Sequence, residues 1–306
     1  MLASILPDER LYELARCTMK VALITGCSSG LGKTLARALH TGSWNAHSAS
    51  GFRVFATSRN IVDLQDLKLE GIDALQLDVT DAESVKSAVD HIVKEAGGID
   101  LLVCNAGIHR IGPIIEQDLS EVKAVIDTNV YGTLLCARAV APVMMRQRSG
   151  VIAAVGSISA SITAPYCGIY SASKAATRSM TEAMRLELSP YSVKATFIEA
   201  GMFRSSIIQK STFDISQYTA EKSWWSRGAS GIQAVAQYIE ETPTTTAEQV
   251  AVAVAKQLCQ KHGPPAHFLV ADKTWINKFL GFIYTFVSSA AIHKIFTSSF
   301  GLGEKW

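Results

Sequence analysis

The sequence is short of the features that mark disulfide-rich, metal-binding and nucleic-acid-binding proteins. Its six cysteines are scattered and form no Cys-x-x-Cys pair, which indicates reduced thiols in an intracellular, cytoplasmic protein rather than a disulfide framework. The seven histidines show no metal-ligand spacing, so we expect no metal site. The formal net charge is only +2, and lysine and arginine form no cluster, so we expect no nucleic-acid partner.

Long hydrophobic runs are also scarce. Residues 1–19 have acidic side chains early and no sustained apolar core, so we interpret them as a short helical extension and not as a secretory signal. The apolar run FLGFIYTFVSSAAI at 279–292 has 14 residues, whereas a membrane-spanning helix needs about 20. The apolar tail, residues 273–306, is therefore expected to be either a hydrophobic lid on the domain or a peripheral anchor on the endoplasmic reticulum or lipid droplets. Flanking tryptophan and lysine are compatible with the anchor, and the two interpretations are equally consistent with the sequence.

The rest of the chain alternates short apolar runs with segments of helical period. A chain of 306 residues can bury a large core, as one big α/β domain or two small ones. The periodicity predicts strands at 20–25, 52–57, 75–79, 99–104, 151–155, 193–198 and 267–271. It predicts helices at about 33–39, 81–96, 119–146, 171–188 and 247–262.

The first expected strand leads directly into a glycine-rich turn and then a helix. This order of strand, turn and helix is the context in which glycine spacing indicates a dinucleotide site, because glycines allow close backbone approach and the helix N-terminus meets the pyrophosphate. The alternative is a helix-entry turn with purely structural glycines. The predicted cofactor contacts in this turn are Gly26, Ser28, Ser29, Gly30, Leu31 and Gly32.

The second expected strand ends at Ser58 and Arg59, where an NAD-binding protein would carry an acidic residue for the ribose. A guanidinium at this position suits a 2′-phosphate, so the sequence favours NADP over NAD. The alternative is that Arg59 is simply a solvated residue after a strand. Asp78, at the end of the third expected strand, is placed on the adenine side. Small residues at Asn105-Ala106-Gly107 would leave room for the cofactor at the switch point of a doubly wound sheet, and we predict that Asn105 and Gly107 contact it.

An asparagine, Asn129, interrupts the apolar pattern of the long helix expected at 119–146. Asparagine is unfavourable in mid-helix, and a buried one needs hydrogen-bond partners. The two interpretations, a buried functional residue and a solvent-facing polar one, are equally consistent with the pattern.

The strand at 151–155 and the helix that follows it carry Ser157, Tyr170 and Lys174. Four residues separate Tyr170 from Lys174, so both point from one helical face. An ammonium beside a phenol favours the phenolate, which predicts a tyrosine pKa shifted from about 10 towards neutrality. Such a tyrosine can exchange a proton with a reacting oxygen, and Ser157 could hydrogen-bond the same oxygen. Tyrosine and lysine at this spacing also occur by chance.

Residues 201–246 lose the alternation and contain Trp224 and Trp225 among many serines, glutamines and glycines. In an open α/β sheet, an elaboration at the carboxyl edge covers the site, so we interpret this segment as a substrate lobe.

The full set of motifs is Thr25-Gly26-x-x-x-Gly30-x-Gly32, Asn105-Ala106-Gly107, Asn129, Ser157 and Tyr170-x-x-x-Lys174. In this order and at these distances it resembles the classical short-chain dehydrogenase/reductase family over about residues 20–272. The resemblance implies a single doubly wound Rossmann-like domain with a seven-stranded parallel sheet. It also implies that Tyr170 is the proton donor, that Lys174 holds the ribose and lowers the tyrosine pKa, that Ser157 polarises the carbonyl and that Asn129 anchors a water relay.

The short stretches GCSSG, FATSR and FGLG look like the branch with fungal acyl-dihydroxyacetone-phosphate reductases and estradiol 17β-dehydrogenases. The family usually has proline before Gly201 and threonine shortly after it, whereas this chain has Glu199-Ala200 and Ser205 or Ser206. We also place Arg138, Phe203 and Ser205 among the expected cofactor contacts.

The sequence thus predicts an NADP(H)-dependent oxidoreductase that interconverts a hydrophobic ketone and a secondary alcohol. Homo-oligomers are common in the family and are expected here. The alternative is a catalytically silent dinucleotide-binding regulator on the same fold.

Overall fold

The computed structural model describes residues 19–44, 51–204, 207, 214–241 and 245–270. The expected N-terminal extension, most of the polar loop that follows Thr41, Ser205 and the apolar tail lie outside these residues. Within the described ranges, no helix is both long enough and apolar enough to cross a bilayer.

Seven parallel strands form one sheet in the order β3-β2-β1-β4-β5-β6-β7. The chain builds outward from β1 to one edge and then, from β4, to the other, which confirms the doubly wound α/β architecture. Alternate residues of each strand face opposite sides of the sheet, and both sides are buried. The strands are β1 Val21–Ile24, β2 Arg53–Ser58, β3 Asp73–Gln76, β4 Leu101–Cys104, β5 Gly150–Val155, β6 Val193–Ala200 and β7 His267–Val270.

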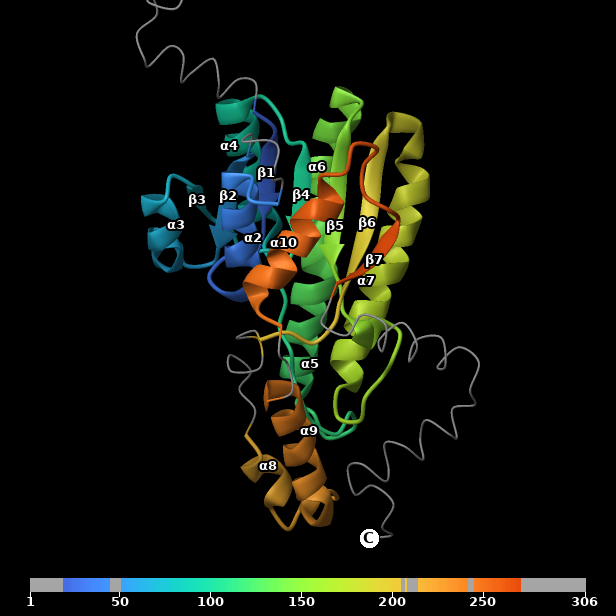
Figure 1. Cartoon of the computed structure of the whole chain (residues 1–306). Coiled ribbons are helices and arrows are strands. Elements are labelled where there is room, and N and C mark those ends of the chain that lie inside the picture. Colours follow the sequence, from blue (N-terminus) through green and yellow to red (C-terminus); the bar gives the residue numbers. More distant parts are fainter. Residues whose placement is uncertain (1–18, 45–50, 205–206, 208–213, 242–244, 271–306) are drawn as a thin grey trace, which may run out of the picture.

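Helices cover both faces of the sheet (Figure 1). One apolar cluster packs α2 and α10 against the first face, and a second packs α4 and α6 against the other. The helices are α2 Gly30–Thr41, α3 Gln65–Leu69, α4 Ala82–Ala96, α5 Leu119–Ile126, α6 Gly132–Gln147, α7 Gly168–Glu187, α8 Ser216–Thr219, α9 Ala229–Glu241 and α10 Ala247–Leu258. Short 3₁₀ turns occupy Ile61–Leu64, Ile158–Ala160, Ser189–Tyr191 and Ser226–Gly228.

Local signals define several helix ends. The Asp81 carboxylate accepts a hydrogen bond from the Glu83 backbone N–H at 3.0 Å and caps α4. Gly97 ends the same helix in the left-handed conformation, with φ 79°. Thr246 and Gln249 form a reciprocal capping box at the start of α10.

Two predicted elements need correction. The third strand was expected at 75–79, but β3 spans Asp73–Gln76, because the chain turns where the Asp78 carboxylate accepts hydrogen bonds from the Thr80 backbone and hydroxyl. The helix expected at 119–146 is present, but it is not α-helical throughout, since a π-helical turn, Asp127–Tyr131, joins α5 to α6. Such turns insert an extra residue into a helix and often lie at functional sites.

The segment expected to be the substrate lobe forms α8 and α9, which lie below the sheet in Figure 1. Its apolar cluster joins Tyr218 and Ile232 to Ile111 and Tyr166, which belong to the loops after β4 and β5. The Glu116 carboxylate binds the Ser223 hydroxyl at 2.7 Å and so links the lobe to the β4–α5 loop. The lobe therefore covers the carboxyl ends of the central strands.

Candidate active site

The glycine-rich turn connects β1 to α2 and is tightly packed. Gly26 and Gly30 have positive φ values of 73° and 57°. A Cβ on Gly26 would lie 2.8 Å from Ala106 Cα, and one on Gly32 would lie 2.5 Å from the Gly26 carbonyl oxygen. The glycines of the motif are therefore required by the backbone path itself.

Four hydrogen bonds between Thr25, Gly26, Asn105 and Ala106 fix this turn to the end of β4. The Asn105 side-chain amide donates to the carbonyl oxygens of Thr25 at 2.9 Å and Gly26 at 3.1 Å. The Thr25 hydroxyl accepts from the backbone N–H groups of Asn105 and Ala106, both at 3.0 Å. The amide of Asn105, expected to be a cofactor contact, is thus engaged in holding the turn.

The start of α2 fits a dinucleotide pyrophosphate. Ser29 is the N-cap residue, yet its side chain makes no capping hydrogen bond, and the first turn of the helix contains no acidic residue. The backbone N–H groups and the positive end of the helix dipole are therefore not neutralised by the helix itself. This donor set suits an anion, and the residues that would hold it are those of the turn: Gly26, Ser28, Ser29, Gly30, Leu31 and Gly32.

At the end of β2, Ser58 is buried and Arg59 is exposed. The Arg59 carbonyl accepts a hydrogen bond from the Gln76 side chain at 3.0 Å, which ties this corner to β3. Within the described part of the chain, no ion pair involves the Arg59 guanidinium. Asp78 follows the end of β3 by two residues. Its carboxylate accepts the two hydrogen bonds from Thr80 described above.

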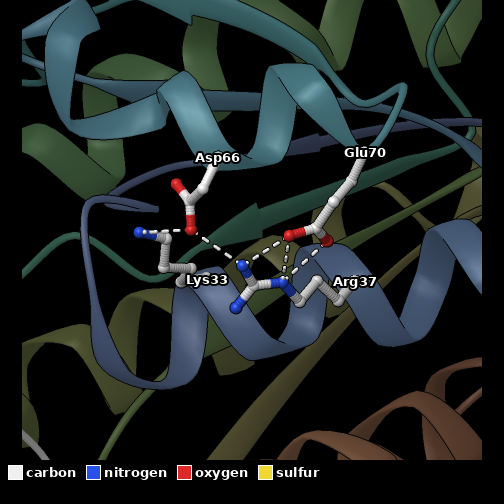
Figure 2. A network of polar contacts seen from close by, with 4 residues as sticks. All are labelled: Lys33, Arg37, Asp66 and Glu70. Atoms are coloured by element: carbon white, nitrogen blue, oxygen red, sulfur yellow. Dashed lines mark hydrogen bonds and ion pairs between the residues drawn. The ribbon is translucent and has the colours of Figure 1, made fainter.

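The two cations of α2 are neutralised by α3, as Figure 2 shows. Lys33 contacts Asp66 at 2.9 Å, and Arg37 contacts both Asp66 at 2.7 Å and Glu70 at 2.8 Å. Hydrogen bonding to Lys33 lowers the pKa of Asp66, and hydrogen bonding to Arg37 lowers the pKa of Glu70. Arg59 is not part of this network, and its guanidinium forms no ion pair with a described residue.

Tyr170 and Lys174 lie in the first two turns of α7 and are both buried. The Lys174 ammonium donates to the Val155 carbonyl at 2.8 Å and lies 5.6 Å from the centroid of the Tyr170 ring. Ser157 caps the 3₁₀ turn after β5 and accepts a hydrogen bond from the Ser159 N–H at 3.1 Å, and its side chain lies close enough to Tyr170 to lower the pKa of the phenol. The structure therefore brings the three predicted catalytic residues together.

The predicted pKa of Tyr170 was wrong in direction. Burial raises the pKa of this phenol to about 12, and the hydrogen bond to Ser157 offsets only part of that increase. Burial also lowers the pKa of Lys174 to about 8. Desolvation is the largest cause of the shift, so Tyr170 is protonated at neutral pH.

Asn129 lies in the π-helical turn and is buried with partners, which excludes the solvent-facing alternative. Its amide donates to the Ile108 carbonyl and to the Ser173 hydroxyl, both at 3.0 Å, and its oxygen accepts from the Ile108 N–H at 2.9 Å. A Cβ on Gly107 would lie 3.2 Å from the Asn129 oxygen and 3.6 Å from the Lys174 nitrogen. Asn129, Gly107 and Lys174 are thus neighbours, and the water relay stays a prediction.

Three of the expected cofactor contacts are not joined to this centre by any described contact. Arg138 is exposed on α6, and Phe203 packs partly buried against the cluster that contains α10. Ser205 lies outside the described residues. These three contacts stay predictions.

Glu199 lies two residues before Gly201, in the segment that departs from the usual family pattern, and its side chain has several partners. Its carboxylate accepts a hydrogen bond from the Ser161 hydroxyl at 2.9 Å and contacts the His267 ring at 2.6 Å. The Arg178 guanidinium donates to Ser161 at 2.7 Å. The Glu199 carboxylate therefore links the loop after Ser157 to β6, β7 and α7.

Sequence reasoning missed His109, which follows Asn105-Ala106-Gly107 by two residues. Its ring is buried, and its centroid lies 4.2 Å from that of Tyr170. Its Nδ1 atom has no hydrogen-bond partner among the described residues. Burial lowers the pKa of this imidazole to about 4, so it is neutral at pH 7. A histidine inside a loop has no periodic signal; only its proximity to the glycine that closes the motif could have pointed to it.

The comparison with protein families identifies the class. The family model for short chain dehydrogenases matches residues 20–215, and the chain belongs to this family. The glycine-rich turn and the Ser157, Tyr170 and Lys174 group all lie within the matched residues.

Individual proteins give the same result. The short-chain dehydrogenase cctT of Talaromyces islandicus is 35% identical over 61% of this chain and 64% of its own length. The 17-beta-hydroxysteroid dehydrogenase type 1 of Homo sapiens is 34% identical over 62% of this chain and 58% of its own length. The chain thus matches less than two thirds of the length of these relatives. A solved short-chain dehydrogenase from Streptomyces avermitilis, 23% identical, shares the fold with a TM-score of 0.72 over 94% of this chain and 99% of its own.

Proposed function

We propose that the protein is an NADP(H)-dependent oxidoreductase that interconverts a ketone and a secondary alcohol, with Tyr170 as the proton donor. One observation supports this most: Tyr170 and Lys174 are both buried on one face of α7, with the Lys174 ammonium 5.6 Å from the centroid of the Tyr170 ring. The chemistry of a bound nicotinamide is hydride transfer at its ring. The role of the chain is to supply a proton and to orient the reacting oxygen.

Each of the three side chains has a distinct task in this proposal. Tyr170 is protonated at neutral pH, which suits reduction, because the hydroxyl gives its proton to the carbonyl oxygen as that oxygen gains charge. Ser157 already accepts one hydrogen bond, and its own proton is directed to the same oxygen. Lys174, held by the Val155 carbonyl, stabilises the tyrosinate that remains.

The preference for NADP rests on Arg59. The side chain is exposed at the carboxyl end of β2, and the described ion pairs leave its charge unneutralised. Lys33, the other cation close to the glycine-rich turn, is paired with Asp66. A 2′-phosphate would therefore meet Arg59, by the bidentate geometry that guanidinium offers.

A hydrophobic substrate is supported by the lobe, where apolar side chains of α8 and α9 pack over the loops that flank Tyr170. The relative from Homo sapiens is named as a steroid dehydrogenase, which fits a lipid, steroid or secondary-metabolite ketone. Membership of the branch with fungal acyl-dihydroxyacetone-phosphate reductases belongs to the same proposal.

We also propose that the apolar tail associates with a membrane or lipid-droplet surface and that the chain forms a homo-oligomer. Deleting residues 275–306 tests the first idea by cell fractionation: the truncated protein should lose membrane association, and retained association would contradict the proposal.

The decisive experiment is NADPH oxidation with a panel of hydrophobic ketones. Tyr170→Phe should lower kcat by about 10²- to 10⁴-fold with nearly unchanged NADPH affinity, since only the proton donor is removed. Tyr131→Phe, which alters an exposed tyrosine, is the matched control and should behave like wild type. Full activity of the Tyr170 variant would overturn the assignment.

A further inference from the structure

His109 is a buried polar side chain that the proposed mechanism leaves without a task. Its ring is 5% exposed, and its Nδ1 has no partner among the described residues. A buried nitrogen that forms no hydrogen bond costs free energy, and native proteins rarely retain one without a reason. Within the described residues, Nδ1 is therefore open to a further hydrogen-bond partner.

The loop that carries His109 is anchored on both sides. Ile108 exchanges two backbone hydrogen bonds with the Asn129 side chain, at 2.9 and 3.0 Å. Arg110 donates to the His109 carbonyl at 2.9 Å and pairs with Glu121 of α5 at 3.2 Å. The imidazole is thus held in place and does not need to be ordered by a ligand, which favours a positioning role.

The neighbour of the imidazole is the proton donor itself. The His109 and Tyr170 rings lie 4.2 Å apart between centroids, at an interplanar angle of 46°. Tyr170 is 9% exposed and His109 is 5% exposed, and their rings are in contact, so a substrate whose reacting oxygen reaches the Tyr170 hydroxyl comes close to the His109 ring. A polar group of the substrate that is hydrogen-bonded to Nδ1 would consequently be attached to a carbon close to the reacting carbonyl.

From this juxtaposition, and on the basis of the proposed function, we infer that His109 positions a second oxygen of the substrate, next to the ketone that Tyr170 protonates. The substrate class is an α-hydroxyketone on a hydrophobic frame. A neutral imidazole nitrogen either donates or accepts, depending on its tautomer, and a hydroxyl can complement both states.

The test compares 4-phenylbutan-2-one with 1-hydroxy-4-phenylbutan-2-one in the full-length protein with NADPH. Wild type should prefer the hydroxyketone by about tenfold in kcat/KM, the value of one buried hydrogen bond, mostly through KM. In His109→Phe, which keeps the stacked ring but removes Nδ1, this ratio should fall to about one. His109→Asn, whose amide restores a polar atom close to the position of Nδ1, should recover most of it.

Tyr166→Phe is the matched control. It also removes a buried polar atom, the Tyr166 hydroxyl, that lacks a partner among the described residues. It should leave the ratio unchanged. An equal fall of the ratio in this variant, or an unchanged ratio in His109→Phe, would overturn the inference.

A binding measurement separates this inference from the proposed reaction. In protein labelled with ¹⁵N-histidine, the Nδ1 signal that His109→Phe removes should shift on addition of the hydroxyketone and not of the plain ketone. If wild type turns over neither ketone, the proposed function is called into question, and the Nδ1 signal alone decides the inference. A shift supports the inference, and no shift overturns it.

Discussion

At the scale of single residues, burial sets the protonation of the candidate site. Desolvation raises the pKa of Tyr170 to about 12 and lowers those of Lys174 to about 8 and His109 to about 4. All three shifts favour the neutral form of the side chain. At pH 7 the site therefore contains a neutral phenol, a neutral imidazole and an ammonium held by the Val155 carbonyl.

The low pKa of His109 predicts acid sensitivity. Between about pH 6.5 and pH 4 the unfolded chain binds a proton on this imidazole and the folded chain does not, so the free energy of unfolding falls as the pH falls. The free energy of unfolding is at its full value, as far as His109 is concerned, above pH 6.5. It is lower by about 3 kcal/mol at pH 4.

Urea unfolding at several pH values measures this effect. The stability of wild type should fall more steeply between pH 7 and pH 4 than that of His109→Phe, because every other titrating group is common to both proteins. Parallel curves for the two proteins would show that the imidazole does not titrate in this window.

The sequence predicted Ser157, Tyr170 and Lys174 as a group, since four-residue spacing places two of them on one helical face. It could not give the sign of the tyrosine shift, because spacing does not report how much solvent a packed loop excludes. His109 was not predicted for the same reason. The ring that it contacts, that of Tyr170, is 61 positions away in the chain and adjacent only in the fold.

At the scale of elements, the ion pairs between α2 and α3 hold the corner of the dinucleotide cradle (Figure 2). Their side chains are 22–44% exposed, so solvent and salt screen the attraction. A double-mutant cycle with Arg37→Gln and Glu70→Gln should give a coupling of about 0.5 kcal/mol that decreases in 1 M salt.

The exposed pair Lys86 and Asp90 within α4 is the control for that cycle. It should show a weaker coupling, because each partner makes one ion contact instead of sharing a network. A salt-independent coupling between Arg37 and Glu70 would mean that packing, and not charge, links the two helices.

The apolar periodicity placed the strands and most helices to within a few residues. It failed at β3, where local hydrogen bonds of Asp78 end the strand early, and at Asp127–Tyr131. A π-helical turn keeps the amphipathic pattern on both sides and changes only the hydrogen-bond register, so no pattern of residue types announces it.

At the scale of the whole molecule, cofactor preference should be visible as thermal stability. A ligand at 100 times its Kd stabilises the folded state by about 2.7 kcal/mol. NADPH should raise the Tm of wild type more than equal NADH does, and Arg59→Asp should reverse that order. Arg185→Asp, an exposed change on α7, is the control. An unaltered order in Arg59→Asp would place the 2′-phosphate elsewhere.

The doubly wound sheet was predictable as a whole, because buried parallel strands alternate with amphipathic helices along the chain. The lobe was predictable only as a loss of that alternation. Its packing depends on contacts such as that of Glu116 with Ser223, which join residues more than a hundred positions apart.

The candidate site is built from two separate chain segments, which can vary in sequence independently of each other. The proposed proton donor, Tyr170, lies after β5, whereas the His109 loop follows β4 and is anchored by Asn129 and Glu121. Random substitutions confined to residues 108–118 would diversify which molecules are accepted without altering the acid that acts on them. A library built on that loop should therefore yield active enzymes with new preferences more often than a library of the same size built on residues 157–174.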